Sequence, residues 1–166
     1  MINDIQIRHA RPDDAGVLSE LIAASYARMA DHYEPALFAR ALPKMAKANP
    51  KLLESGTYYV ALVGEDAAGC GGWTLELPGG GLIEGVAHIR HFATHPEHLR
   101  KGVASRLLDH CLERAHRAGA TAMRAWSTLP GEAFYTAAGF VRLRPIDVPM
   151  GPGVLLPSIE MERPLP

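Results

Sequence analysis

The size and charge of the chain exclude several classes of function before any motif is considered. Its 166 residues (17.9 kDa), 48% of them hydrophobic and 21% charged, suit one compact domain over residues 1–166. The formal net charge of -1, with no basic block, argues against a nucleic-acid partner. Residues 1–10 are too polar for a signal peptide, and no apolar run is long enough to span a bilayer, so we expect no membrane association and a cytoplasmic protein.

The two cysteines do not indicate a disulfide or a metal site. Cys70 and Cys111 are far apart in the chain, and neither lies near a cluster of Cys and His residues. This usage is typical of reduced thiols in a reducing compartment. We therefore expect neither a disulfide nor a bound metal.

The first elements follow from hydrophobic periodicity. Apolar and polar residues alternate over residues 5–8, which indicates a strand, and Asp13 or Asp14 is placed to cap a helix. That helix carries one apolar stripe at three- and four-residue spacing, formed by Val17, Leu18, Leu21, Ile22 and Tyr26.

Prolines and β-branched or aromatic residues predict the elements that come next. Residues 35–56 are helical in type but contain Pro43 and Pro50, so we expect two or three short helices. The β-rich segments 57–63 and 69–77 are joined by a short turn and predict an antiparallel hairpin. A glycine-rich loop follows the hairpin.

The second half of the chain alternates between strand and helix patterns. The predicted elements are a strand at 86–94, a helix from 102 to about 118, a strand at 122–127, a helix at 131–138, and strands at 140–145 and 154–162. No internal repeat is present. This order predicts an α/β domain built around a mixed sheet, with a strand-helix-strand unit at its centre.

The start of the central helix has the features of an anion site. The first turn of a helix leaves backbone N–H groups unpaired and carries a partial positive charge, which stabilises a phosphate. Gly102, with the small Ala104 and Ser105, lets an anion approach this backbone, and Arg100 and Lys101 add positive charge. The sequences of a nucleotide P-loop and of a dinucleotide fingerprint are absent. An ordinary turn glycine is the alternative interpretation of Gly102.

A second motif identifies a family. The stretch HPEHLRKGVASRLL (95–108), followed further along the chain by AFYTAAGF (133–140), resembles the GNAT superfamily of acyl-CoA-dependent N-acetyltransferases, in its small-molecule type. The resemblance in element order covers nearly the whole chain. It implies a single-domain GNAT fold of the α/β class, with a mixed, mainly antiparallel sheet splayed between strands 86–94 and 122–127 and flanked by helices. It also implies acetyl-CoA as the co-substrate, bound in the cleft between these strands, and no metal.

The resemblance also implies which residues hold acetyl-CoA. In the family, the loop matched by LRKGVA (99–104) binds the pyrophosphate through backbone amides, and a bulge matched by residues 92–94 pairs with the pantetheine arm. The implied contacts are Phe92, Ala93, Thr94, Leu99, Arg100, Lys101, Gly102, Val103, Ala104, Ser105 and Tyr135. Leu99 stands where the family usually has Arg or Gln, and Pro130 or a neighbour replaces an Asn often found shortly before the family's Tyr. Both departures should weaken cofactor affinity modestly.

Acetyl transfer from a thioester to an amine requires a stabilised oxyanion and a proton for the departing thiolate. The resemblance places Tyr135 as the acid that protonates the sulfur. The backbone amides of Phe92 and Ala93, left unpaired where the strands splay, are expected to hold the thioester carbonyl.

The general base is expected on the same strand. His88 lies four residues before Phe92, where several family members carry a catalytic Glu, and a neutral imidazole can accept a proton at neutral pH. Regular alternation places His88 and His91 on opposite faces of the strand, so only one of them can face the substrate. We prefer His88 as the base, with Glu84, His91 or water as the alternatives.

The acceptor is expected to be a primary amine of a small molecule or a peptide, attacked directly in a ternary complex without an acyl-enzyme. By family analogy, Tyr26, Met29, Tyr33 and the loop 147–157 can line its pocket, and no anionic cluster indicates a polycationic substrate. The alternative function is a non-catalytic acyl-CoA-binding module or sensor of the same fold. The sequence leaves open the identity of the amine, a preference for a longer acyl-CoA, and whether the chain forms a homodimer.

Overall fold

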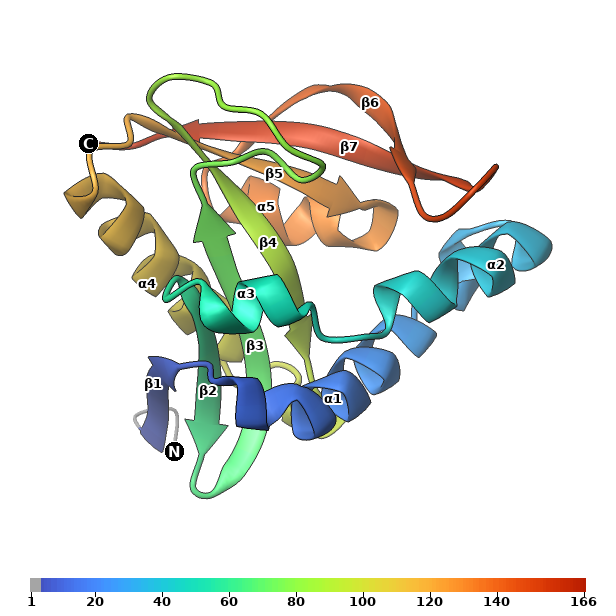
Figure 1. Ribbon diagram of the computed structural model, residues 1–166, viewed down its shortest axis with the longest axis horizontal. Helices are drawn as coiled ribbons and strands as arrows, with labels where there is room; N and C mark the ends of the chain where they lie inside the picture. Colours follow the sequence, from blue (N-terminus) through green and yellow to red (C-terminus); the bar gives the residue numbers. More distant parts are fainter. Residues whose placement is uncertain (1–3) are drawn as a thin grey trace.

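The computed structural model describes residues 4–166 and arranges them around one seven-stranded sheet. Across the sheet, the strands are β1 (Ile5–His9), β2 (Tyr58–Val63), β3 (Asp66–Thr74), β4 (Val86–Thr94), β5 (Ala122–Thr128), β7 (Leu155–Pro164) and β6 (Val141–Pro149). Neighbouring strands are antiparallel except β4 and β5, which are parallel. The expected mixed, mainly antiparallel sheet is therefore confirmed (Figure 1).

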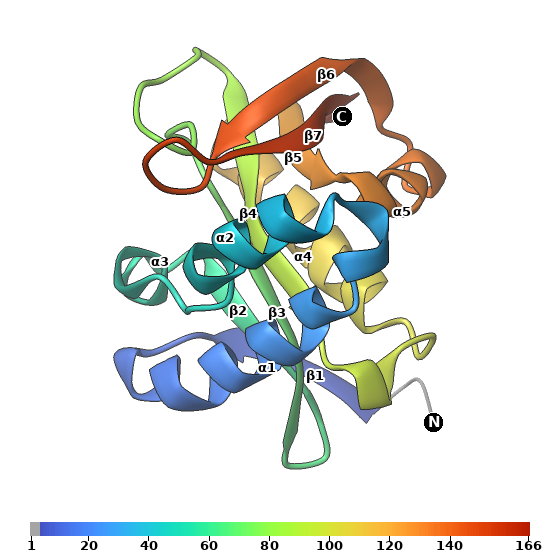
Figure 2. The same cartoon turned by 90° about the vertical axis from the view of Figure 1, so that its right-hand side faces the viewer.

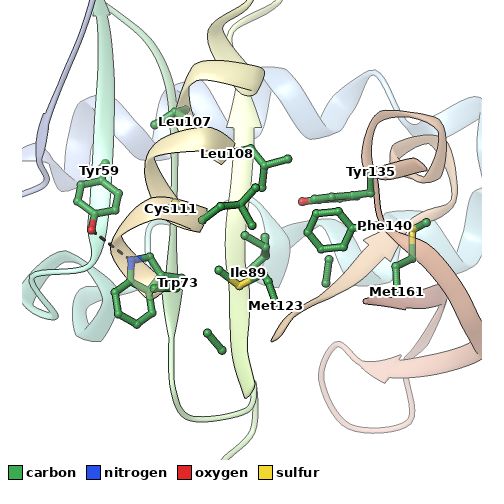
Figure 3. Packing of buried hydrophobic residues seen from close by; sticks show 14 of the residues in the cluster. Tyr59, Trp73, Ile89, Leu107, Leu108, Cys111, Met123, Tyr135, Phe140 and Met161 are labelled. Carbon is green, nitrogen blue, oxygen red and sulfur yellow. Dashed lines mark hydrogen bonds between the residues drawn. The ribbon is translucent and has the colours of Figure 1, made fainter. Parts of the chain in front are cut away.

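Helices cover both faces of this sheet. They are α1 (Ala15–Ala27), α2 (Pro35–Met45), α3 (Pro50–Glu54), α4 (Val103–Arg117) and α5 (Glu132–Ala137). Helices α1 and α2 lie on one face of the sheet, and α4 lies on the other (Figure 2). We call these the α1–α2 face and the α4 face. Leu18, Ile22 and Phe38 belong to the apolar layer of the first. Leu107, Leu108 and Cys111 belong to that of the second, which Figure 3 shows.

Most of the predicted elements are present, and the differences have local causes. Pro43 was expected to break or end a helix, but it lies in the last turn of α2. A proline there removes one intrahelical hydrogen bond, while Phe38, Ala41 and Met45 of the same helix stay buried. The last two strands run further than the predicted 140–145 and 154–162, because β6 and β7 pair with each other as far as Pro149 and Leu155.

The sheet is split at its centre. Strands β4 and β5 pair only through Val86–His88 and Ala122–Arg124. Beyond this point β4 stays with β3 up to Thr94, whereas β5 stays with β7 up to Thr128. The two strands therefore diverge towards their carboxyl ends (Figure 1), and α4 begins beyond the end of β4. This gap confirms the predicted splay.

A β-bulge bends β4 where the gap opens. Two residues, His91 and Phe92, lie opposite the single residue Gly71 of β3, and His91 has a φ of +51°. Gly71 is needed because the ring of Phe92 occupies the place where a Cβ would lie. The bulge begins one residue before the segment Phe92–Thr94 that the resemblance implied.

The two cysteines are free and buried. Burial raises the pKa of Cys70 to about 12 and raises the pKa of Cys111 well above its ordinary value. Neither thiol can therefore supply a thiolate nucleophile near neutral pH. In residues 4–166, no three His, Cys, Asp or Glu side chains gather as a metal site would need. No helix in the same range is long and apolar enough to cross a membrane.

Gly72 tests the close packing of β3 against its neighbour. A side chain at Gly72 would collide with the backbone of Thr57 and Tyr58. We expect Gly72→Ala to lower the free energy of unfolding by about 1–3 kcal/mol, because backbone must move to admit the methyl group. Gly16 in α1 is the matched control, since nothing lies within 4 Å of an added Cβ and Ala stabilises a helix by about 0.5–1 kcal/mol over Gly. Urea unfolding measures both variants, and a Gly72→Ala protein as stable as the wild type would contradict this packing.

Candidate active site

The turn between β4 and α4 presents open backbone amides. Arg100 and Gly102 both have left-handed backbone conformations, with φ of +61° and +83°. Gly102 is the N-cap residue of α4, and no side chain of the described residues caps this helix. The N–H groups of its first turn are therefore available to a ligand, with the positive end of the helix dipole behind them. Backbone amides around left-handed residues of this kind form concave anion sites.

The other residues expected at the pyrophosphate surround this backbone. Small or exposed side chains belong to Leu99, Arg100, Lys101, Ala104 and Ser105. Leu99 adds no polar group. Val103 is buried, and an added Cβ on Gly69 of β3 would lie 2.6 Å from its Cγ1. The Val103 side chain therefore packs against the sheet, which leaves its amide as the part that can meet a ligand.

The backbone of β4 divides its polar groups between β3 and the gap. The His95 N–H donates to the Ala68 carbonyl of β3 at 2.8 Å, and these groups alternate in direction along a strand. The Ala93 amide therefore also points to β3, so the expected unpaired amide at Ala93 is wrong. The Thr94 amide points away from β3, and its N–H donates to Oγ of Ser25 at 3.4 Å.

Two tyrosine hydroxyls form hydrogen bonds with backbone groups on opposite edges of the gap. On the β4 edge, the Tyr26 hydroxyl donates to the Phe92 carbonyl at 3.0 Å. That the Phe92 amide faces the gap stays a prediction, because regular alternation does not fix the direction of an amide at a bulge. At the end of β5, the Tyr33 hydroxyl accepts the Leu129 N–H at 2.9 Å. The sequence did not indicate these two contacts, which hold backbone rather than an acceptor.

The other residues expected in the acceptor pocket are part of the apolar layer on the α1–α2 face. Met29 and Met150 pack against that layer, and Val154 and Leu156 belong to it. Nη2 of Arg40 in α2 donates to the Gly153 carbonyl at 3.3 Å. The expected loop 147–157 therefore consists of the ends of β6 and β7 and the turn between them, and Gly153 of this turn is hydrogen-bonded to α2.

Tyr135 offers a free hydroxyl at the interior end of the gap. Its ring packs edge-on against Phe134 and Phe140, with centroid distances of 5.1 and 5.2 Å. The hydroxyl points towards α4 near Leu108 (Figure 3) and makes no hydrogen bond with any residue in 4–166. Burial, with a smaller effect of Cys111, raises the pKa of Tyr135 above its usual value near 10. The phenol therefore stays protonated and can donate.

The bulge brings both candidate histidines to one face of the sheet. Ala87 and Ile89 belong to the apolar layer on the α4 face, so His88 between them points to the α1–α2 face. Nε2 of His91 lies 2.8 Å from the carbonyl oxygen of Met45 in α2, which places His91 on the α1–α2 face as well. The expectation of opposite faces is wrong because the bulge occurs at His91 itself.

The three candidate bases differ in their surroundings. Glu84 is exposed in the loop before β4. His91 already contacts the Met45 carbonyl. His88 is 2% exposed, and both of its ring nitrogens lack a hydrogen-bond partner among the described residues. Since a buried polar group without a partner is costly, His88 has hydrogen-bonding capacity that a water or a ligand would satisfy.

The charges around His88 keep its imidazole neutral. Burial, followed by the positive charges of Arg124 and Arg90, lowers the pKa of His88 to about 4, against an opposing effect of Glu160. His88 therefore carries an available lone pair throughout the neutral pH range. This pKa lies below the ordinary value near 6.5 on which the sequence analysis relied.

A set of charged side chains, which the sequence analysis did not single out as a site, surrounds His88 on this face. Arg124 pairs with Glu162 at 2.8 Å and lies 3.8 Å from Glu160, while Arg144 pairs with Glu160 at 2.7 Å. We call these residues, with His88, Arg90 and Trp126, the polar cluster. Their alternation with apolar residues along β5 and β7 is the period-two signal that could have found them.

Comparison with known proteins agrees with this geometry. A family model for the acetyltransferase (GNAT) family matches residues 21–140. A GCN5-related N-acetyltransferase structure from Rhodopseudomonas palustris is similar, with a TM-score of 0.77, 21% identity, and coverage of 96% of this chain and 95% of that one. A search of curated proteins gives no significant match.

Two further structures share the fold. The PaiA N-acetyltransferase of Thermoplasma acidophilum, solved with coenzyme A, has a TM-score of 0.72 and 17% identity, covering 96% of this chain and 98% of that one. Ard1 of Thermoplasma volcanium has a TM-score of 0.68 and 18% identity, covering 98% and 99%. Because the family match spans more than half of the sequence, the chain belongs to the GNAT family of acetyltransferases.

Proposed function

We propose that this N-acetyltransferase moves an acetyl group from acetyl-CoA to a primary amine of a small molecule or peptide, by direct attack in a ternary complex. The observation that carries the proposal is the gap between β4 and β5. It has the open amides of α4 beside one strand end and the free Tyr135 hydroxyl inside. The Thermoplasma relative solved with coenzyme A supports this donor.

The residues around the gap are suited to bind acetyl-CoA, the acetyl donor. The amides that follow Gly102 would hold the pyrophosphate, with Arg100 and Lys101 adding exposed positive charge. Since Leu99 supplies no hydrogen bond, the affinity rests mainly on backbone contacts. The Phe92 amide and the β4 edge would pair with the pantetheine arm. Acetyl-CoA supplies the activated acetyl thioester.

We assign one residue to each proton transfer in the reaction. Attack forms a bond between the acceptor nitrogen and the acetyl carbon and breaks the bond from that carbon to sulfur. The Phe92 N–H stabilises the negative charge on the acetyl oxygen, and Tyr135 donates to the departing sulfur. His88 accepts the proton that the nitrogen loses, directly or through water. With a pKa of about 4, His88 is a weak base, so this transfer is easiest after the new bond has acidified the nitrogen.

Thiol release with a broad panel of primary amines tests the proposed function. We expect release of CoA that depends on both the enzyme and the amine. The alternative, a non-catalytic acyl-CoA-binding module, predicts saturable acetyl-CoA binding without release for any amine in the panel.

Gly102→Val tests the anion site at the start of α4. A branched side chain beside the amides, at a residue with φ of +83°, should raise the dissociation constant of acetyl-CoA by at least about tenfold. Gly119→Val is the matched control, because Gly119 has φ of +97° just beyond the other end of α4, with open space around it. Calorimetric titration compares the two, and equal affinities would place the pyrophosphate elsewhere.

Tyr135→Phe tests the acid. Removal of the hydroxyl should lower kcat by about 10- to 100-fold with little change in acetyl-CoA affinity, because the ring and its packing remain. Tyr59→Phe serves as the control, since the Tyr59 hydroxyl on β2 accepts the indole N–H of Trp73 on β3 at 3.2 Å. Steady-state kinetics would show an unchanged kcat for Tyr135→Phe if this residue had no role in proton transfer.

His88→Ala tests the base through the pH dependence of kcat/KM. In the wild type we expect activity to fall as the pH drops towards 4, because protonation removes the His88 lone pair. The variant should lose this acidic limb and about 10- to 100-fold of its activity at neutral pH. The exposed His116 provides the control substitution. An acidic limb retained in His88→Ala would assign the base to another group.

A further inference from the structure

Arg90 differs from the other arginines of the polar cluster. Arg124 and Arg144 form ion pairs with carboxylates of β7 at 2.8 and 2.7 Å. Arg90 makes no ion pair with any residue in 4–166, and its Nη1 donates to the neutral Thr74 hydroxyl at 3.0 Å. A guanidinium has five N–H donors. This half-buried one therefore has donors left for a ligand.

The charge of Arg90 is only weakly compensated. Burial lowers its pKa, and the carboxylate that opposes this effect belongs to Glu76, which is exposed in the loop after β3. A buried or half-buried cation gains most from a partner of opposite charge. An anion that entered beside Arg90 would supply that partner.

Arg90 faces a cavity large enough for a small molecule. The cavity has a volume of about 840 Å³ and lies among α3, the end of β3 and the loop that follows it. Figure 1 shows this loop above α3. Its charged lining residues are Arg90, Lys51 and Glu76, which gives an excess of one positive charge. The apolar lining residues are Leu52, Trp73, Leu75, Leu77 and Leu82. The cavity therefore combines a cationic group with an apolar wall.

Two residues that line the cavity, Arg90 and Thr74, are close neighbours of the buried His88, which does not line it itself. His88 and Arg90 are two residues apart on one face of β4, so their Cα atoms are roughly 7 Å apart. Thr74, which also lines the cavity, is the register partner of His88 in β3. A molecule bound at Arg90 thus has to extend only a few bonds to bring an amine to the His88 side of the sheet.

We propose that the acetyl acceptor is a small amine that carries a carboxylate and an apolar group, as an apolar α-amino acid does. Arg90 binds the carboxylate through paired N–H donors, a geometry that guanidinium groups provide for planar carboxylates. The leucines of the cavity hold the apolar group, and the amine faces His88. This inference rests on the proposed acetyl transfer, since it names the acceptor of that reaction.

Thermal unfolding with matched ligands tests the acceptor without requiring turnover. Leucine, methionine and phenylalanine are each compared with the corresponding amide, with and without free CoA. We expect a carboxylate to raise the unfolding midpoint of the wild type more than its amide does. In Arg90→Gln this difference should vanish, because the dissociation constant of the amino acid rises at least about tenfold. Arg117→Gln is the control, since Arg117 pairs with Glu113 on the exposed surface of α4.

Kinetics separates carboxylate binding from a structural role of Arg90. With an amino acid that is acetylated, Arg90→Gln should raise KM at least about tenfold and change kcat less. With the matching amide, KM should be the same in wild type and variant. A variant that simply misfolds would lose activity towards both substrates and would also lose the CoA-induced rise of the unfolding midpoint.

Three outcomes would overturn the assignment of the acceptor. One is an equal midpoint shift, or none, for every acid and amide pair. Another is an undiminished carboxylate preference in Arg90→Gln. The third is a larger shift with phosphoethanolamine than with the amino acids, which would assign the site to a phosphate. Carboxylate-dependent binding without thiol release from any amine would instead contradict the proposed acetyl transfer and leave the ligand of Arg90 established.

Discussion

The rest of the site depends on the point at which β4 and β5 stop pairing. Three register pairs hold the two strands together, and after His88 each strand follows a different neighbour. This divergence frees the polar groups on one edge of β4 and places the start of α4 beside that edge. The bulge at His91 and Phe92, permitted by Gly71, turns the strand at the same place. Tyr26 and Tyr33 then fasten the two edges from the α1–α2 face.

Electrostatics divides the site into two parts with different tasks. At the start of α4, open amides and exposed basic side chains favour an anion without any buried charge. On the α1–α2 face, the ion pairs of Arg124 and Arg144 with β7 carboxylates are already complete. Apart from Glu160 Oε1, which contacts Arg144 as an ion pair without a hydrogen bond, the unused hydrogen-bonding groups among the described residues of the polar cluster belong to His88 and Arg90. An acetyl donor bound at the start of α4 and an acetyl acceptor bound at His88 and Arg90 would meet in the gap, near Tyr135.

Local sequence patterns were sufficient to predict most helices and strands, because period-two and helical periodicity reflect which residues are buried. The family motifs were sufficient to predict the gap between β4 and β5 and the turn at Gly102. Sequence reasoning failed where one residue changes the direction of a strand. The bulge at His91 moved that side chain to the face opposite the predicted one. After the bulge, the hydrogen bonds between β3 and β4 place the Ala93 amide on the β3 side. The sequence contains Arg90 and Glu160, but the side chains that surround each of them come from strands distant in the sequence.

The central claim is that the gap and the start of α4 bind acetyl-CoA. Thermal unfolding of the wild-type protein with acetyl-CoA and with free CoA tests it most directly, because a ligand that binds only the folded state raises the midpoint by mass action. The account predicts a clear rise with both ligands, since both carry the pyrophosphate for which we propose the α4 amides as the binding site. An unchanged midpoint at millimolar concentrations of either ligand would contradict it.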